Sequence, residues 1–171
     1  QDAIIQEKQT GTAAWVLSKP ANRSAFILSK MAADAIGILL FIILVPGVVL
    51  LAEIYLVTKS VLPFMPFLAS LGLFLLALLF YLSLVTLLGV LFESRKPVLG
   101  TAYGVLFGGT IFIQLVPQST FYLPFGLDKI ASLVALEKPL PDMAFVGVIV
   151  TAVLSILFIL VALFRFQKLE L

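Results

Sequence analysis

The chain has 171 residues, of which 62% are hydrophobic and only 12% are charged, and its formal net charge is +2. A soluble domain is about half apolar and about a quarter charged, so this composition predicts an integral membrane protein. The small net charge argues against nucleic acid as a partner. The absence of Cys and His excludes disulfides, thiolate metal sites, cysteine nucleophiles and imidazole acid–base chemistry.

Residues 1–30 form the longest polar stretch and precede the first apolar segment. They carry four of the eleven basic residues, namely Lys8, Lys19, Arg23 and Lys30. Basic residues just before a hydrophobic helix belong on the cytoplasmic side. We therefore expect two parts, a cytoplasmic amphipathic segment over 1–30 and a transmembrane domain over 31–171. An ordinary juxtamembrane helix is the alternative interpretation of the first part.

A sequence pattern lies within this polar segment. Glu7 is followed by Gly11-Thr12, Leu17-Ser18, Pro20, Arg23 and Lys30. The order and spacing resemble those of the type-two exporter family of ABC-type transporter permeases, roughly E-x-x-x-G-T-x-x-x-x-L-S-x-P-x-x-R-x-x-x-x-x-x-K. The sequence departs from that pattern at Ala21-Asn22, where the family more often has Val or Ile followed by Ser or Thr.

The resemblance implies a function for the chain. It would be the membrane-spanning permease subunit of an ATP-driven exporter, present here as the C-terminal part of a longer protein. A separate ATPase subunit would carry the ATP and Mg, and a second permease copy or homologue would complete the assembly in membrane lipid. The residues that would contact or shape the ATPase-coupling segment are Glu7, Gly11, Thr12, Ser18, Pro20, Arg23 and Lys30.

Four apolar segments follow, each near or above the roughly 20 residues that a helix needs to cross a bilayer. They predict an all-α, polytopic transmembrane helical bundle with spans at about 33–56, 67–92, 98–116 and 143–164. Pro46-Gly47 lies near the middle of the first span and predicts a kink there. The second span contains no charged residue, so we expect it to face lipid or the bundle interior without carrying solute chemistry.

The third span carries three glycines at four-residue spacing, Gly100, Gly104 and Gly108. Small residues at this spacing let another helix approach closely, so we predict a helix-packing face, or more specifically a subunit interface. Gln114 in the same span predicts a solute contact or an interhelical hydrogen bond. Asp34 and Glu53 lie near opposite ends of the first span, where interfacial solvation competes with a role in solute or proton movement.

The loops between the spans predict the orientation of the chain. Residues 117–142 form a polar interval, in which 127–136 is expected to be a short helix at the outer surface. With the beginning of the chain inside, the cytoplasmic pieces hold eight Lys and Arg and the outer pieces hold three. Because positive residues concentrate in cytoplasmic loops, we predict a multi-pass plasma-membrane protein with both chain ends cytoplasmic.

Catalytic and nucleotide-binding motifs are missing from the sequence. It contains no G-x-x-x-x-G-K-[ST] loop, no G-x-S-x-G elbow and no H-E-x-x-H pair. We therefore expect no enzyme activity, no metal and no cofactor in this chain. Two alternatives to the exporter subunit remain. One is a non-transporting scaffold or assembly protein that binds a cytoplasmic partner through 1–30, and the other is an ion-coupled secondary transporter.

Overall fold

The computed structural model describes residues 23–59 and 63–167, and every regular element in these two ranges is helical. In chain order they are α3 (Arg23–Gly37), η1 (Ile38–Leu44), α4 (Val45–Thr58), α5 (Phe64–Leu91), α6 (Arg95–Leu115), η2 (Pro117–Ser119), η3 (Pro124–Gly126), α7 (Leu127–Ala135) and α8 (Ala144–Gln167).

Within the described residues, four helices are long and apolar enough to cross a membrane. They are Ser24–Thr58, Phe64–Leu91, Arg95–Leu115 and Ala144–Gln167, the first being the continuous rod formed by α3, η1 and α4. The all-α transmembrane bundle with four spans is thus confirmed. The first span begins nine residues earlier than predicted, so residues 24–30 continue directly into it.

Two further helices begin earlier than expected, because prolines that we placed before these helices lie within their first turns. α5 begins at Phe64 rather than 67, with Pro63 as its N-cap and Pro66 in its first turn. α6 begins at Arg95, so Pro97 also lies in a first turn. The first backbone N–H groups of a helix have no intrahelical acceptor, so proline is tolerated there.

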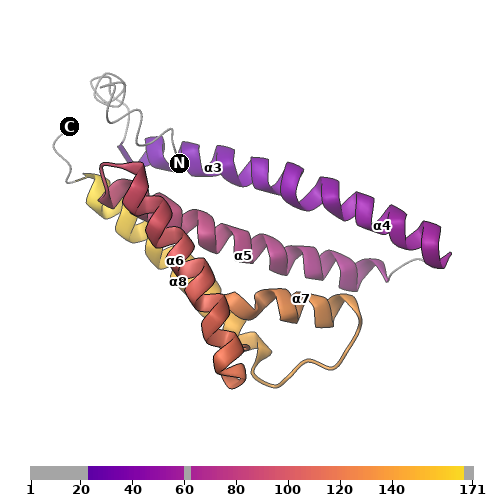
Figure 1. The fold of residues 1–171 in the computed structure, drawn as a ribbon. Coiled ribbons are helices and arrows are strands. Elements are labelled where there is room, and N and C mark those ends of the chain that lie inside the picture. Colours follow the sequence, from indigo (N-terminus) through magenta and orange to yellow (C-terminus); the bar gives the residue numbers. More distant parts are fainter. Residues whose placement is uncertain (1–22, 60–62, 168–171) are drawn as a thin grey trace.

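α5 is the central helix of the bundle. It packs against α7, α8 and α3, and α6 lies against its C-terminal part. Figure 1 shows α3 and α4 running alongside α5, while α6 and α8 diverge from them toward the bottom of the view. The beginning of α3 meets the end of α8, where the Gln167 side chain donates a hydrogen bond to Ser24 Oγ at 2.8 Å. The first span therefore starts on the side of the bundle where the last span ends.

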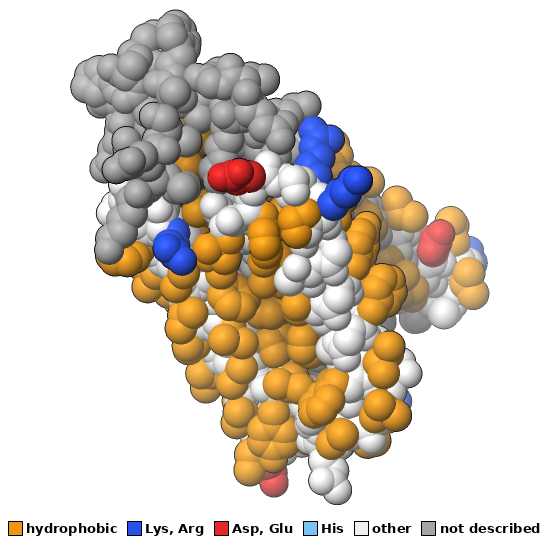
Figure 2. Space-filling view, turned by 60° about the vertical axis from the view of Figure 1, so that its left-hand side comes forward, with side chains coloured by type: hydrophobic (Ala, Val, Ile, Leu, Met, Phe, Trp, Pro, Cys, Tyr) orange, Lys and Arg blue, Asp and Glu red, His pale blue; other side chains and the backbone are white. Residues whose placement is uncertain are grey.

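Apolar side chains cover the middle of the molecule. Figure 2 shows an orange and white face with the charged side chains gathered toward the ends. The most apolar windows of the first and third spans are only 11% buried within the chain. Such broad apolar exposure is what lipid accommodates, so the protein is an integral membrane protein.

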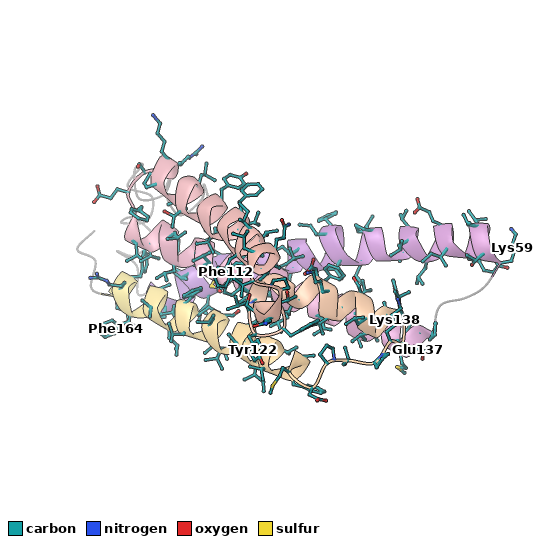
Figure 3. The ribbon with its side chains drawn as sticks, turned by 60° about the horizontal axis from the view of Figure 1, so that its bottom comes forward. Lys59, Phe112, Tyr122, Glu137, Lys138 and Phe164 are labelled. Carbon is teal, nitrogen blue, oxygen red and sulfur yellow. The ribbon has the colours of Figure 1, made fainter. Side chains whose placement is uncertain are left out.

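Two helices end in left-handed residues, Lys59 after α4 and Glu137 after α7, with φ of 54° and 52°. The residue after Glu137, Lys138, donates its N–H to the Leu133 carbonyl at 2.9 Å, and this bond closes a Schellman motif. Figure 3 shows Lys59, Glu137 and Lys138 at one end of the molecule and Phe164 at the other. The α4–α5 and α7–α8 connections therefore share the end opposite the α3–α8 contact.

Candidate functional site: a pocket between the spans

The first span is irregular at its middle, where the sequence predicts a kink. Residues Ile38–Leu44 form a π-helix, and the Val45 N–H bonds to the carbonyl of Leu40, five residues back. The return to α-helical register falls at Pro46, which has no N–H to offer. π-helical turns are rare and are often found at functional sites.

The segment after α6 is the second irregular element. We expected a short helix at the outer surface, and α7 is indeed a helix, but it packs alongside the N-terminal half of α5 (Figure 1). Just before it, the Phe125 ring meets the Phe80 ring edge-on, with centroids 6.3 Å apart. Phe80 is roughly 24 Å along α5 from its first residue, at 1.5 Å per residue. The segment thus folds back to the middle of the bundle.

Close backbone contacts fix this segment in place. A Cβ on Gly109 of α6 would overlap the Phe125 ring, and a Cβ on Gly126 would overlap the Thr120 carbonyl. At Gly147 of α8 a Cβ would lie 2.6 Å from the carbonyl oxygen of Phe121. Glycine at these three positions therefore lets 120–126 pack between α6 and α8.

Both irregular elements contribute residues to the wall of a cavity of about 520 Å³. Its walls come from η1 and α4, α5, α6, and the η3–α7 segment. It is lined by Ile42, Ile43, Pro46, Gly47, Leu50, Leu71, Phe74, Ala77, Leu78, Tyr81, Leu106, Thr110, Pro124, Phe125 and Asp128. The lining is apolar apart from Tyr81, Thr110 and Asp128.

These three polar residues differ in what they offer a ligand. The Thr110 hydroxyl donates a 2.8 Å hydrogen bond to the Leu106 carbonyl within its own helix. None of the described hydrogen bonds or ion pairs involves the Tyr81 hydroxyl or the Asp128 carboxylate. The pocket therefore presents one carboxylate and one phenol in an apolar wall.

Other polar side chains in the spans are satisfied locally. The hydroxyl groups of five buried residues each donate to a carbonyl three or four positions back in the same helix, at 2.6–2.8 Å; they are Ser70, Ser83, Thr86, Thr151 and Ser155. Such bonds remove the cost of burying a hydroxyl in an apolar environment. These hydroxyls are therefore satisfied within their own helices, and none of the five residues lines the pocket.

The predicted site residues lie elsewhere. Glu7, Gly11, Thr12, Ser18 and Pro20 fall outside the described residues, and Arg23 is the first residue of α3. Lys30 lies in α3 with its Nζ 5.7 Å from the centroid of the Phe26 ring. Asp34, Glu53 and Gln114 are exposed and are not part of the pocket wall. In the described part of the chain, no group of three or more His, Cys, Asp or Glu is placed to hold a metal ion.

The glycine face on α6 is open. A Cβ added at Gly100, Gly104 or Gly108 would meet no described atom within 4 Å, apart from neighbours in its own helix. The intrachain close approach is made by Gly109 instead. The predicted packing at the three spaced glycines therefore remains a prediction for contact with another chain.

Sequence reasoning missed Tyr81 and Asp128. Tyr81 lies in the span that we expected to carry no solute chemistry, and Asp128 lies in the short helix that we expected at the outer surface. One signal was available: Tyr81 is the only tyrosine in the run 64–91. The fold-back of 120–128 depends on tertiary contacts with Phe80 and Gly109, which a local pattern does not encode.

Comparison with known proteins corrects the family assignment. Residues 2–171 match a family described as a protein of unknown function, DUF2705. No curated protein and no solved structure matches the chain. No ABC-transporter family matches it either, so the resemblance drawn from Glu7 to Lys30 was wrong as a family assignment. Eight matching positions in a short motif weigh less than a match over nearly the whole chain, and the chain belongs to the DUF2705 family.

Proposed function

We propose that the chain is a membrane-spanning subunit of a transport assembly and that its pocket admits an apolar or amphipathic solute from the bilayer. The observation that carries this proposal is the meeting of two irregular backbone segments, η1–Pro46 and 117–126, at one cavity. Irregular backbone at membrane depth is tolerated only where protein buries it or where it lines a cavity. Transporters commonly build their solute sites from such broken helices.

The exposure of the pocket wall supports entry from the lipid side. Ile42 is 53% exposed and Leu50 is 45% exposed, although both line the cavity. In a bilayer these side chains would meet acyl chains. A lipid-like solute would therefore reach the pocket sideways, without crossing the polar ends of the bundle.

The source of energy is part of the same proposal and is independent of any family assignment. A separate ATPase subunit would bind residues 1–30 on the cytoplasmic side of the plasma membrane, and a second membrane subunit would complete the assembly. The continuity of residues 24–30 with the first span supports this proposal, because a push on α3 would reach η1 and the pocket wall directly. Native full-length protein should co-purify with an ATPase in mild detergent, and Arg23→Glu should weaken that association.

A scaffold or assembly protein is the second candidate. The low burial of the first and third spans favours it, since another membrane protein would cover these faces as well as lipid does. Co-purification separates the two candidates. A stoichiometric integral membrane partner without any ATPase would favour the scaffold.

The proposed function is tested by photo-crosslinking. A diazirine-bearing fatty alcohol, which carries no charge, is added to the full-length protein in nanodiscs, and the labelled peptides are identified by mass spectrometry. We expect enrichment at pocket residues such as Ile42, Leu78 and Phe125 over the outward side of α8. Ala77→Phe, which fills the pocket, should remove this enrichment, whereas Ala69→Phe on the exposed side of α5 should retain it. Equal labelling in native protein and Ala77→Phe would contradict the proposal.

A further inference from the structure

We propose that the pocket selects a lipophilic organic cation, meaning a molecule with an apolar body and a weakly hydrated positive head. This inference deepens the proposed function, because it rests on the same pocket. It is argued from three features of the wall: its charge, its aromatic rings and its size.

The charge of the wall is negative. Asp128 is an exposed residue and the one charged residue among those that line the cavity, and no described ion pair neutralises its carboxylate. Asp128 lies in the first turn of α7, whose free N–H groups carry roughly half a positive charge. A full carboxylate charge exceeds that partial charge, so the pocket attracts a cation and repels an anion. Lys129 is the next residue, but it does not line the cavity.

Aromatic rings surround the same space. Phe74, Tyr81 and Phe125 line the cavity together with Asp128, and they come from α5 and η3. The faces of aromatic rings attract cations, and quaternary ammonium groups are commonly bound in this way. A strongly hydrated ammonium group would lose its water in so apolar a wall, whereas a bulky organic cation has little hydration to lose.

The size of the cavity suits one such molecule. Ligand pockets typically measure about 300–1,000 Å³, and this one measures about 520 Å³. An acyl or aryl body would replace lipid against Ile42, Leu50 and Leu71, while the head would lie near Asp128. The wall thus matches an amphiphilic cation at both of its ends.

Tetraphenylphosphonium and tetraphenylborate provide the test, because they are hydrophobic ions of nearly equal size and opposite charge. Binding of each is measured by equilibrium dialysis with full-length protein in nanodiscs, and binding to empty nanodiscs is subtracted. We expect the cation to bind at least about tenfold more tightly than the anion. Asp128→Asn should remove most of this preference, and Asp128→Glu should keep it.

A matched control and the contrary outcomes complete the test. Asp142→Asn removes a carboxylate outside the pocket and should leave the preference unchanged. Equal binding of the two ions, a preference that survives Asp128→Asn, or no binding above empty nanodiscs would each overturn the cation proposal. These outcomes are independent of the photo-crosslinking: labelling by the uncharged fatty alcohol that depends on Ala77 would preserve the proposed function even if the cation preference fails.

Discussion

The two halves of α5 have nearly the same apolar composition but different surroundings. In the C-terminal half, a nearly continuous stretch from Ser83 to Val90 is buried against α3, α6 and α8. In the half before Phe80, only Phe67 and Ser70 are buried. Hydrophobicity alone therefore does not decide which half packs, since lipid is as apolar as a protein core.

The C-terminal half of α5 lies at the filled end of the bundle, where the first and last helices pack against it. Ile27 of α3 and Phe166 of α8 are at most 1% exposed, and both belong to one cluster with Leu87 and Val90 of α5. Toward the other end, α4 touches α5 near Gly47 and Leu71 and has no other buried residue. We infer that the filled end is rigid and that the other end, near α4, is open, with the pocket at the boundary between them.

The largest effect is expected where the pocket wall is tightest. In Gly126→Ala the new methyl group overlaps the Thr120 carbonyl, which belongs to the backbone and cannot rotate away. We expect a loss of about 3 kcal/mol in the free energy of unfolding, measured by denaturant titration in mixed micelles. Gly72→Ala in α5 is the control, because its methyl group enters open space and Gly72 does not line the pocket. Equal stability of the two variants would show that the segment 120–126 adapts freely.

An intermediate effect is expected at the filled end. Phe166→Ala removes a buried ring that stacks on Phe26, with centroids 5.9 Å apart. We expect a loss of about 2 kcal/mol, below the 3–5 kcal/mol typical of soluble cores, because lipid solvates exposed apolar groups. Phe164→Ala, at a ring that is 57% exposed, should change the stability by less than about 0.5 kcal/mol. If the two losses are equal, the filled end is no more rigid than the lipid-facing surface.

The sequence was sufficient to predict the four spans but not to predict the pocket between them. Long apolar runs predict four helices because a bilayer requires about 20 apolar residues in each. The predicted starts of α5 and α6 were a few residues too late, because Pro66 and Pro97 fit the first turn of a helix as well as a loop. Pro46 allowed the irregular middle of the first span to be predicted.

The remaining features depend on contacts between distant residues. The fold-back of Phe125 onto Phe80 and Gly109 brings Asp128 beside Tyr81, and these residues are far apart in the sequence. A local pattern in 117–142 therefore predicts a polar loop with a helix but does not place it. The same limit applies to the glycines of α6: their spacing predicts a packing face at Gly100, Gly104 and Gly108, which stays a prediction, and it does not indicate the intrachain contact at Gly109.

The smallest change in stability is expected at the boundary between the two ends. Pro46→Ala restores an N–H at the point where the π-helix returns to α-helical register, so the span gains a backbone hydrogen bond and Ile38–Leu44 straightens. We expect stability to rise by about 1 kcal/mol and amide exchange over 38–50 to slow in hydrogen-exchange mass spectrometry. Binding of tetraphenylphosphonium should weaken, because η1 and Pro46 form one wall of the pocket. Ala52→Val, on the exposed side of α4, is the control for altered helix propensity. Unchanged exchange in Pro46→Ala would mean that the π-helix is held by its contacts with α5, and the open end would then be shaped by packing rather than by proline.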